Sequence, residues 1–181
     1  ATKIFAEANS NFEAMKHKAL SPGAAVTNLG SLTMKAKNTV TLGQSYNMCG
    51  LIEGENSQEY GVISAHWDHL GSLIDQQGNK SIYRGAIDNG TGLASLLELG
   101  RYFSQRKPKK NLLLCSFTAE EQGLLGAKYF VENPPIPLTS ITGMLNFDCL
   151  NVGQKTNTVT FYGPKDNKLY PLLRDQAAKQ G

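Results

Sequence analysis

Two kinds of hydrophobic pattern alternate along this sequence. Short and mainly apolar runs at residues 60–65, 111–118 and 141–147 predict strands, and the almost wholly apolar run at 60–65 fits a strand that is buried on both faces. Between these runs, apolar residues at helical spacing predict helices over residues 91–106 and 123–132. Strands that alternate with helices are typical of a parallel sheet covered by helices. The pattern therefore predicts an α/β fold, namely a three-layer α/β/α sandwich with a mixed, mainly parallel central sheet.

The segments that flank this alternation carry weaker patterns. Helical spacing, with acidic residues early and basic residues late, predicts a helix over residues 3–20. Alternation over residues 31–42, with Leu32 and Met34 among the apolar positions, predicts a half-buried outer strand whose antiparallel partner is residues 46–52. Three further segments are predicted to be a surface loop, a strand and a helix, in that order: residues 71–84, 156–162 and 169–178.

The composition suits a globular domain and argues against nucleic acids and membranes as partners. The 181 residues are 40% hydrophobic and 18% charged, so we expect a single domain over residues 1–181 with a sizeable core. The net charge is only +3, and the lysines at 107, 109 and 110 are expected to form a solvated loop and not a nucleic-acid patch. No apolar stretch approaches the ~18 residues of a membrane span, and the first residues show no apolar signal-peptide region. We therefore expect neither nucleic-acid binding nor a membrane span.

The three cysteines, Cys49, Cys115 and Cys149, show no CxxC spacing. An odd and sparse set argues against a disulfide framework and against a zinc ribbon. Two of the three lie inside apolar runs, where cysteine commonly serves as a small buried hydrophobe. We expect that role for them, and the redox compartment stays open.

Acidic and histidine side chains follow the apolar runs, which is where the chemistry of this chain is expected. In open α/β sheets, ligands bind beyond the carboxyl ends of the strands, so residues far apart in the sequence can meet there. The residues in question are His66, Asp68, Asp88, Glu120, Glu121 and Asp148. Their recurrence at strand ends makes one metal site the leading hypothesis.

Each of these residues also has a purely structural interpretation. Asp88 precedes a predicted helix and could be its N-cap, and adjacent acids such as Glu120 and Glu121 can simply complement a helix dipole. Only the repetition of the pattern favours the metal site over these alternatives. Two neighbouring carboxylates can also divide the work, one binding a metal ion and the other accepting a proton. His69 could be a ligand as well, but we interpret it as part of the loop structure.

Four segments resemble, in collinear order, the co-catalytic zinc aminopeptidases, a family that includes bacterial leucyl aminopeptidase and, more distantly, glutamate carboxypeptidase. They are residues 65–71, 85–92, 119–126 and 146–148. The resemblance covers roughly residues 45–165 and is specific because four motifs occur in the family's order. It implies the α/β/α sandwich of the zinc peptidases. It also implies an enzyme that hydrolyses peptide bonds with the help of two Zn²⁺ ions.

The resemblance also implies a set of metal ligands. His66 and Asp148 would bind one zinc ion, Glu121 would bind the other, and Asp88 would bridge both. Family members supply a further histidine on a late loop, and no residue after His69 matches it. We therefore expect a C-terminally incomplete catalytic domain, in which the 181-residue chain binds metal weakly or incompletely and is nearly inactive. By the same resemblance, an extracytoplasmic or secreted location is expected.

The remaining roles concern catalysis. By resemblance, Glu120 would be the general base and Asp68 would orient His66. Removal of N-terminal residues is the expected reaction, because clustered carboxylates favour the free α-amino group of a peptide substrate. Three alternatives stay open: an inactive relative that only binds, a single-zinc aminoacyl cyclase of the same fold, and a structural α/β module. The oligomeric state cannot be inferred from the sequence.

Overall fold

The computed structural model describes all residues except 1, 25, 32, 76, 165 and 181. By their internal packing, two compact units are distinguished, Ala1–Leu42 and Gly43–Gly181. The sequence predicts one catalytic domain over residues 1–181, and this remains a prediction. The residues that carry the predicted site all belong to the second unit.

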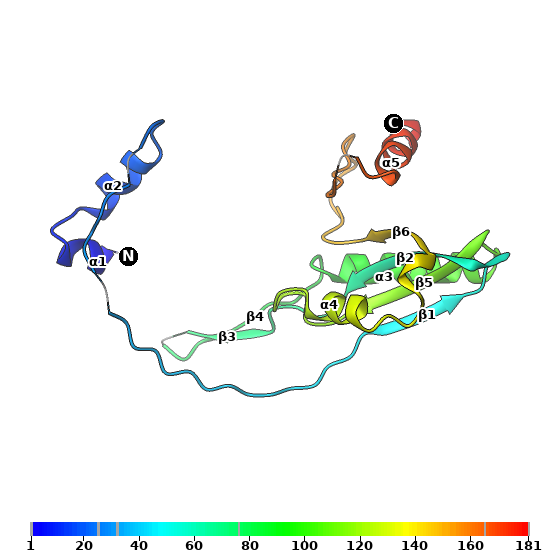
Figure 1. Ribbon diagram of the computed structural model, residues 1–181, viewed down its shortest axis with the longest axis horizontal. Coiled ribbons are helices and arrows are strands. Elements are labelled where there is room, and N and C mark those ends of the chain that lie inside the picture. The colour runs from blue at the N-terminus through cyan, green and yellow to red at the C-terminus, as the bar shows by residue number, and fades with distance from the viewer. Residues whose placement is uncertain (1, 25, 32, 76, 165, 181) are drawn as a thin grey trace. The chain divides into compact units, whose positions relative to one another are not determined.

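A four-stranded mixed sheet forms the centre of the second unit (Figure 1). Its strands are β1, β2, β5 and β6, which span Met48–Ile52, Asn56–His66, Lys110–Phe117 and Ile141–Asn146. They lie in the order β1-β5-β2-β6, where β1 is antiparallel to β5 and the other two pairings are parallel. The prediction of a mixed, mainly parallel sheet is confirmed. Because β5, β2 and β6 run in one direction, their carboxyl ends meet at the same edge.

Helices cover both faces of the sheet, as the three-layer prediction requires (Figure 1). They are α3 and α4, which span Gly90–Ser104 and Leu125–Glu132. Gly100 of α3 packs on Leu114, whose Cδ1 would lie 3.1 Å from a Cβ at that glycine. The ring of Phe130 in α4 meets the ring of Phe117 edge-on, with 5.4 Å between centroids. Leu114 and Phe117 are three residues apart on β5 and therefore point to opposite faces.

The main core lies between the sheet and α4. Five buried residues form it: Val62, Leu113, Cys115, Phe117 and Phe130. On β5, alternate residues from Leu113 onward contribute to this core, while Leu114 between them faces α3. Burial on both faces explains why β5 is an almost unbroken apolar run and was predicted from the sequence.

Leu113→Ala should lower the free energy of unfolding by about 2–5 kcal/mol, because it removes buried methyl groups and leaves a cavity. Leu113 is 5% exposed, whereas Leu97 on α3 is 74% exposed. Leu97→Ala is thus a matched control, with an expected change within about 0.5 kcal/mol. Urea unfolding followed by circular dichroism measures both values. Equal losses in the two variants would contradict the packing of β5.

The first unit contains two short helices in place of the one predicted over residues 3–20. They are α1 and α2, which span Thr2–Glu7 and Phe12–Ala19. Between them Asn9 adopts a left-handed backbone with φ of 51°, which ends an α-helix. The Asn11 side chain then accepts a hydrogen bond from Ala14 N at 2.9 Å as the N-cap of α2. The prediction of one continuous helix is wrong because these asparagines favour a break.

The outer strand predicted over residues 31–42 does not form in the described part of that stretch, and Leu32 lies outside the described residues. Met34 is 79% exposed. The expected partner segment contributes β1, which pairs with β5 and not with residues 31–42. This prediction is wrong because alternation makes a strand only where a neighbouring strand supplies the hydrogen bonds.

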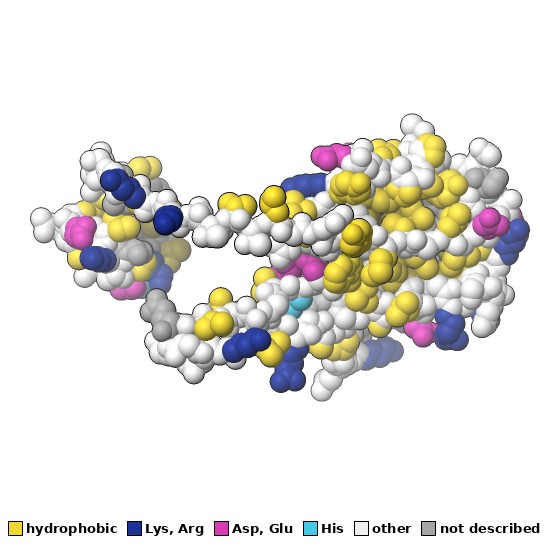
Figure 2. All heavy atoms as spheres, turned by 90° about the horizontal axis from the view of Figure 1, so that it is seen from below, with side chains coloured by type: hydrophobic (Ala, Val, Ile, Leu, Met, Phe, Trp, Pro, Cys, Tyr) yellow, Lys and Arg dark blue, Asp and Glu magenta, His cyan; other side chains and the backbone are white. Residues whose placement is uncertain are grey.

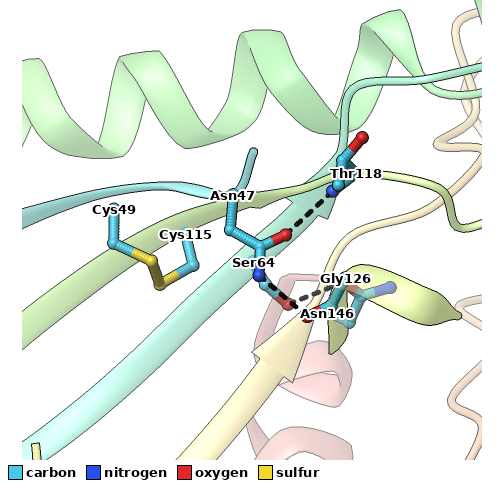
Figure 3. The surroundings of a disulfide bond; sticks show 7 residues. All are labelled: Asn47, Cys49, Ser64, Cys115, Thr118, Gly126 and Asn146. Atoms are coloured by element: carbon cyan, nitrogen blue, oxygen red, sulfur yellow. Dashed lines mark hydrogen bonds between the residues drawn. A yellow bond between two sulfur atoms is a disulfide. The ribbon is translucent and has the colours of Figure 1, made fainter. Parts of the chain in front are cut away.

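A disulfide joins Cys49 of β1 to Cys115 of β5, which lie opposite each other in register with Cα atoms 4.2 Å apart (Figure 3). The expectation that these cysteines are unpaired hydrophobes is therefore wrong, although Cys115 is fully buried. Their sequence separation of 66 residues gives no sign of the pairing, which depends on the neighbour that β1 finds. Cys149 is free and exposed.

Asn47 fastens the start of β1 to the carboxyl end of β5 (Figure 3). Its Oδ1 accepts a hydrogen bond from Thr118 N at 3.1 Å, and its Nδ2 donates to the carbonyl of Gly126 at 2.8 Å. A Cβ at Gly126 would overlap with Thr118 and Asn47, so a glycine lets α4 begin this close to the strand. The short loop between them contains Glu120 and Glu121 and is thereby fixed at both ends.

Four smaller elements lie in the described part of the second unit. They are β3, β4, the 3₁₀ helix η1 and α5, which span Ser72–Ile74, Lys80–Ile82, Leu138–Ser140 and Leu169–Gln180. The helix predicted over 169–178 is confirmed, but the loop predicted over 71–84 contains the antiparallel pair β3 and β4. The strand predicted over 156–162 is wrong, since that stretch is largely exposed and forms no strand. Among the described residues, no helix has the length and hydropathy of a transmembrane segment.

Candidate metal centre

All four predicted metal ligands lie at the carboxyl edge of the parallel strands. His66 ends β2, Glu121 follows β5, Asp148 follows β6, and Asp88 stands just before the N-cap of α3. They form two clusters that share Asp88: one with His66 and Asp148, the other with Glu121 and a residue not predicted as a ligand, His69. Figure 2 shows acidic side chains next to a histidine on the face that it presents. Residues from four separate segments thus converge on one place.

The first cluster surrounds the buried imidazole of His66, which is 2% exposed. Its Nδ1 lies 3.0 Å from the carbonyl oxygen of Asp68, an acceptor, so Nδ1 carries a proton and Nε2 presents its lone pair. Nε2 faces Asp88 Oδ1 at 3.0 Å and Asp148 Oδ1 at 3.5 Å, yet it is buried and makes no hydrogen bond. A lone pair directed at two carboxylates is unfavourable unless a proton or a cation lies between them. These donors therefore fit a metal ion.

The electrostatics of His66 agree with this geometry. Burial lowers the pKa of the imidazole, but the hydrogen bond to the Asp68 carbonyl and the negative charges of Asp148, Glu120 and Asp88 outweigh burial. The pKa of His66 therefore lies above its ordinary value. Without metal, a proton on Nε2 relieves the repulsion between the carboxylates.

Metal affinity at the first cluster should consequently depend on pH, because a proton and a metal ion compete for Nε2. With the pKa of His66 raised, competition begins at a higher pH than for an ordinary imidazole. Zinc affinity should fall by about tenfold per pH unit below that pKa and level off above it. Titrations between about pH 5.5 and 8.5 measure this. An affinity that stayed constant over this range would contradict a role for His66 Nε2.

Asp68 connects the two clusters through its backbone and its side chain. Its carbonyl oxygen holds His66 Nδ1, as described above, while its carboxylate lies 3.7 Å from the same nitrogen. The two carboxylate oxygens instead accept hydrogen bonds from the backbone N–H groups of Glu120 at 3.0 Å and Glu121 at 3.3 Å. Asp68 was expected to orient His66 only. In the structure, its side chain also holds the loop that carries both glutamates.

Glu120 borders a cavity of about 220 Å³ together with His66. The other residues around this cavity are largely apolar: Phe117, Thr118, Leu124, Ala127, Met144 and Asn146. Burial raises the pKa of Glu120; the nearby His66 lowers it, and the negative charges of neighbouring carboxylates raise it further. The net pKa lies above the ordinary value. A carboxylate with a raised pKa is a better proton acceptor, which suits a general base.

The second cluster contains a residue that sequence reasoning assigned to the loop. His69 Nδ1 lies 2.6 Å from Glu121 Oε1 and 3.9 Å from Asp88 Oδ1. The signal that could have found it is the spacing of two histidines, three residues apart, immediately after a buried strand.

Sequence reasoning also missed the polar residues that hold the acidic loops. The Asn89 side chain accepts from Gly92 N at 3.0 Å as the N-cap of α3 and donates to the Phe147 carbonyl at 2.8 Å. Thr91 Oγ1 accepts from Leu150 N at 3.0 Å. The start of α3 is therefore tied to the backbone on both sides of Asp148, and this fixes the distance between Asp88 and Asp148.

Cys149 is next to the first cluster but is poorly suited as a metal ligand. Burial, followed by hydrogen bonds and the charges of Asp148 and Asp88, raises its pKa to about 11. Among the described residues, the groups spaced to hold a metal ion contain histidine, aspartate and glutamate and do not include Cys149. The candidate donors are therefore imidazole nitrogen and carboxylate oxygen.

Two curated relatives are proteases by name, and the chain matches only part of each. It is 36% identical over 95 residues to a probable zinc metalloprotease of Pyrenophora tritici-repentis, covering 52% of this chain and 21% of that protein. It is 41% identical over 94 residues to a vacuolar membrane protease of Schizosaccharomyces japonicus, covering 52% and 10%. The chain thus spans about a fifth or less of the length of these two proteins.

Solved structures and family models complete the comparison. A zinc aminopeptidase from Bacillus subtilis is 27% identical, with a TM-score of 0.47, over 57% of this chain and 24% of that one. The model of peptidase family M28 matches residues 47–181, which contain every residue of the candidate metal centre. The chain therefore belongs to peptidase family M28.

Proposed function

We propose that this chain carries the metal ligands and the general base of a zinc-dependent peptidase that removes N-terminal residues from peptides. The observation that supports this most is the convergence of two histidine and carboxylate clusters on a shared Asp88. Glu120 stands at the same edge, beside His66 and a largely apolar cavity. Acidic residues that only cap helices are not expected to converge on one place with two histidines.

Two zinc ions are proposed, one for each cluster. His66, Asp88 and Asp148 would hold one ion, and Asp88 and Glu121 would contribute to the other. Imidazole and carboxylate donors suit zinc, and the three protein ligands of the first ion would leave the open position of a catalytic site. When bound, such ions polarise the scissile carbonyl and acidify the attacking water.

The side chains of the chain supply the proton transfer. Glu120 accepts a proton from the attacking water and passes it to the leaving amine, a role that its raised pKa supports. Asp68 keeps the backbone of Glu120 in place through the hydrogen bond to its N–H group. Proton transfer by a fixed carboxylate is thus built into the same edge of the sheet as the metal ligands.

The proposed substrate is a peptide with a free N-terminus. Four carboxylates, Asp88, Glu120, Glu121 and Asp148, concentrate negative charge at the site and would attract an α-ammonium group. The cavity beside Glu120 is lined by Phe117, Leu124 and Met144 among others, so it offers an apolar side chain a place near the general base. Leucine p-nitroanilide is therefore a suitable first substrate.

Hydrolysis of leucine p-nitroanilide and of its N-acetylated form tests this proposal. The enzyme would be the chain extended to the length of the curated relatives, supplied with zinc. We expect zinc-dependent cleavage of the free-amine substrate and at least tenfold slower cleavage of the blocked one. Equal cleavage of both would exclude an aminopeptidase. Cyclisation of an N-terminal glutamine without hydrolysis would favour the cyclase alternative.

A further inference from the structure

His69 is held in one orientation by three neighbours. Its Nδ1 lies 2.6 Å from Glu121 Oε1. Its ring packs edge-on against Tyr83, with 6.1 Å between centroids. Gly85, at φ +65°, lies against it so closely that a Cβ there would come within 3.3 Å of His69 Cβ. A side chain enclosed in this way, 20% exposed, is not a free loop residue.

The contact between His69 and Glu121 is a hydrogen bond with a defined direction. A carboxylate only accepts, so Nδ1 is the donor. The distance of 2.6 Å is at the short end for a charge-assisted bond, whereas Asp88 Oδ1, at 3.9 Å, is beyond hydrogen-bonding reach. Two atoms that bind one zinc ion at about 2.0–2.2 Å in tetrahedral geometry lie about 3.4 Å apart. The observed distance therefore suits a hydrogen bond and not joint ligation.

The segment that contains His69 contacts the end of β5 step by step. Trp67 N donates to the Phe117 carbonyl at 2.9 Å, which extends the parallel pairing by one residue. The Asp68 carboxylate then accepts from the backbone of Glu121, and the His69 ring binds the side chain of the same glutamate. The backbone and the carboxylate of Glu121 are thus both fixed from one neighbouring segment.

We propose that His69 is a positioning residue for Glu121: its Nδ1–H group holds one carboxylate oxygen and leaves the other free to bind a metal ion. His69 is then not a ligand itself. The inference rests on the proposed function, because it assigns Glu121 to the second ion. Ligating carboxylates that are themselves hydrogen-bonded keep their orientation, and loss of such a partner weakens metal binding by about 10- to 100-fold.

Three substitutions separate positioning from ligation. In His69→Asn, the amide nitrogen is attached to Cγ as Nδ1 is, so it can still donate to Glu121. In His69→Gln, the donor lies one bond further out, at the position of Nε2, and in His69→Ala the donor is absent. His17→Ala, an exposed histidine of the first unit, is the control. Zinc affinity is measured for each variant in the chain extended to the length of the curated relatives, by competition with a chromophoric chelator.

We expect His69→Asn to keep the zinc affinity within about threefold, and His69→Gln and His69→Ala to weaken binding of the second ion by about 10- to 100-fold. His17→Ala should bind as the unchanged chain does. Equal losses in His69→Asn and His69→Ala would show that His69 is a ligand and overturn the proposal. Equal affinities in all variants would overturn it too. An unchanged chain that binds no zinc at all would instead contradict the proposed function.

The ring itself gives a readout that needs no metal. Long-range ¹⁵N–¹H correlation spectra of the ¹⁵N-labelled chain report which nitrogen of His69 carries the proton, with His69→Gln to assign the signal. We expect a protonated Nδ1 both without zinc and with it. In Glu121→Ala, which removes the acceptor, that proton should exchange faster with water. An unprotonated Nδ1, or one that loses its proton when zinc is added, would overturn the proposal.

Discussion

Glu120→Gln is expected to lower turnover by about 10²- to 10⁴-fold while leaving the zinc content nearly intact. The amide has nearly the same shape as the carboxylate, so the backbone hydrogen bond to Asp68 can remain. What is lost is the basic oxygen beside His66, whose raised pKa suits proton transfer. Turnover of leucine p-nitroanilide is measured in the chain extended to the length of the curated relatives, with metal content determined on the same sample.

Glu132→Gln is the matched control, because Glu132 ends α4 and is exposed. It should leave turnover and zinc content unchanged. One result for Glu120→Gln would reverse the roles of the two adjacent glutamates. If Glu120→Gln lost zinc but kept activity per bound metal ion, Glu120 would be the ligand and Glu121 the base.

Asp88→Ala is expected to lose metal at both clusters, the largest effect on binding of any single substitution. Asp88 is the shared member: its Oδ1 lies 3.0 Å from His66 Nε2 and 3.9 Å from His69 Nδ1. The loss in affinity should exceed the roughly 10- to 100-fold that removal of an outer hydrogen-bond partner costs. Its side chain is 40% exposed, so the fold should survive, and circular dichroism checks this.

Two further variants, each with a substitution in only one cluster, serve as comparisons for Asp88→Ala. Asp148→Ala should affect only the ion held by His66, and Glu121→Ala only the other ion. Asp175→Ala, on the exposed surface of α5, should affect neither. Zinc stoichiometry and affinity by calorimetry compare the four variants. If Asp88→Ala weakened binding no more than Asp148→Ala, the two clusters would not share a ligand.

The central part of the fold could be predicted because β5 and β2 lie inside the sheet and are covered on both faces. The edge strand β6 alternates half-buried and exposed residues and was predicted from its mainly apolar run. A residue such as Leu113 must be apolar for the core under α4, and Leu114 must be apolar for the contact with α3. Continuous apolar runs followed by polar residues therefore identified β5, β2 and β6 and the sheet edge where they end. His66 ends β2 and Asp148 follows β6, so the same pattern predicts that the two residues lie at one edge of the sheet.

The outer parts could not be predicted because their structure depends on neighbours. Residues 31–42 alternate as a strand does, but β1 pairs with β5 and leaves this stretch without a partner in the described chain. The bond between Cys49 and Cys115 follows from that pairing. The role of His69 could not be predicted for a similar reason: its partner Glu121 is distant in the sequence and is placed next to it by the end of β5.

The X-ray absorption spectrum at the zinc edge, recorded on the 181-residue chain with one equivalent of zinc, reports directly whether His66 and the carboxylates bind the ion. We expect a shell of nitrogen and oxygen ligands at about 2.0–2.2 Å with the multiple scattering of an imidazole, from His66, Asp88 and Asp148. A sulfur ligand at about 2.3 Å, which Cys149 would supply, or the spectrum of hydrated zinc without an imidazole, would contradict it.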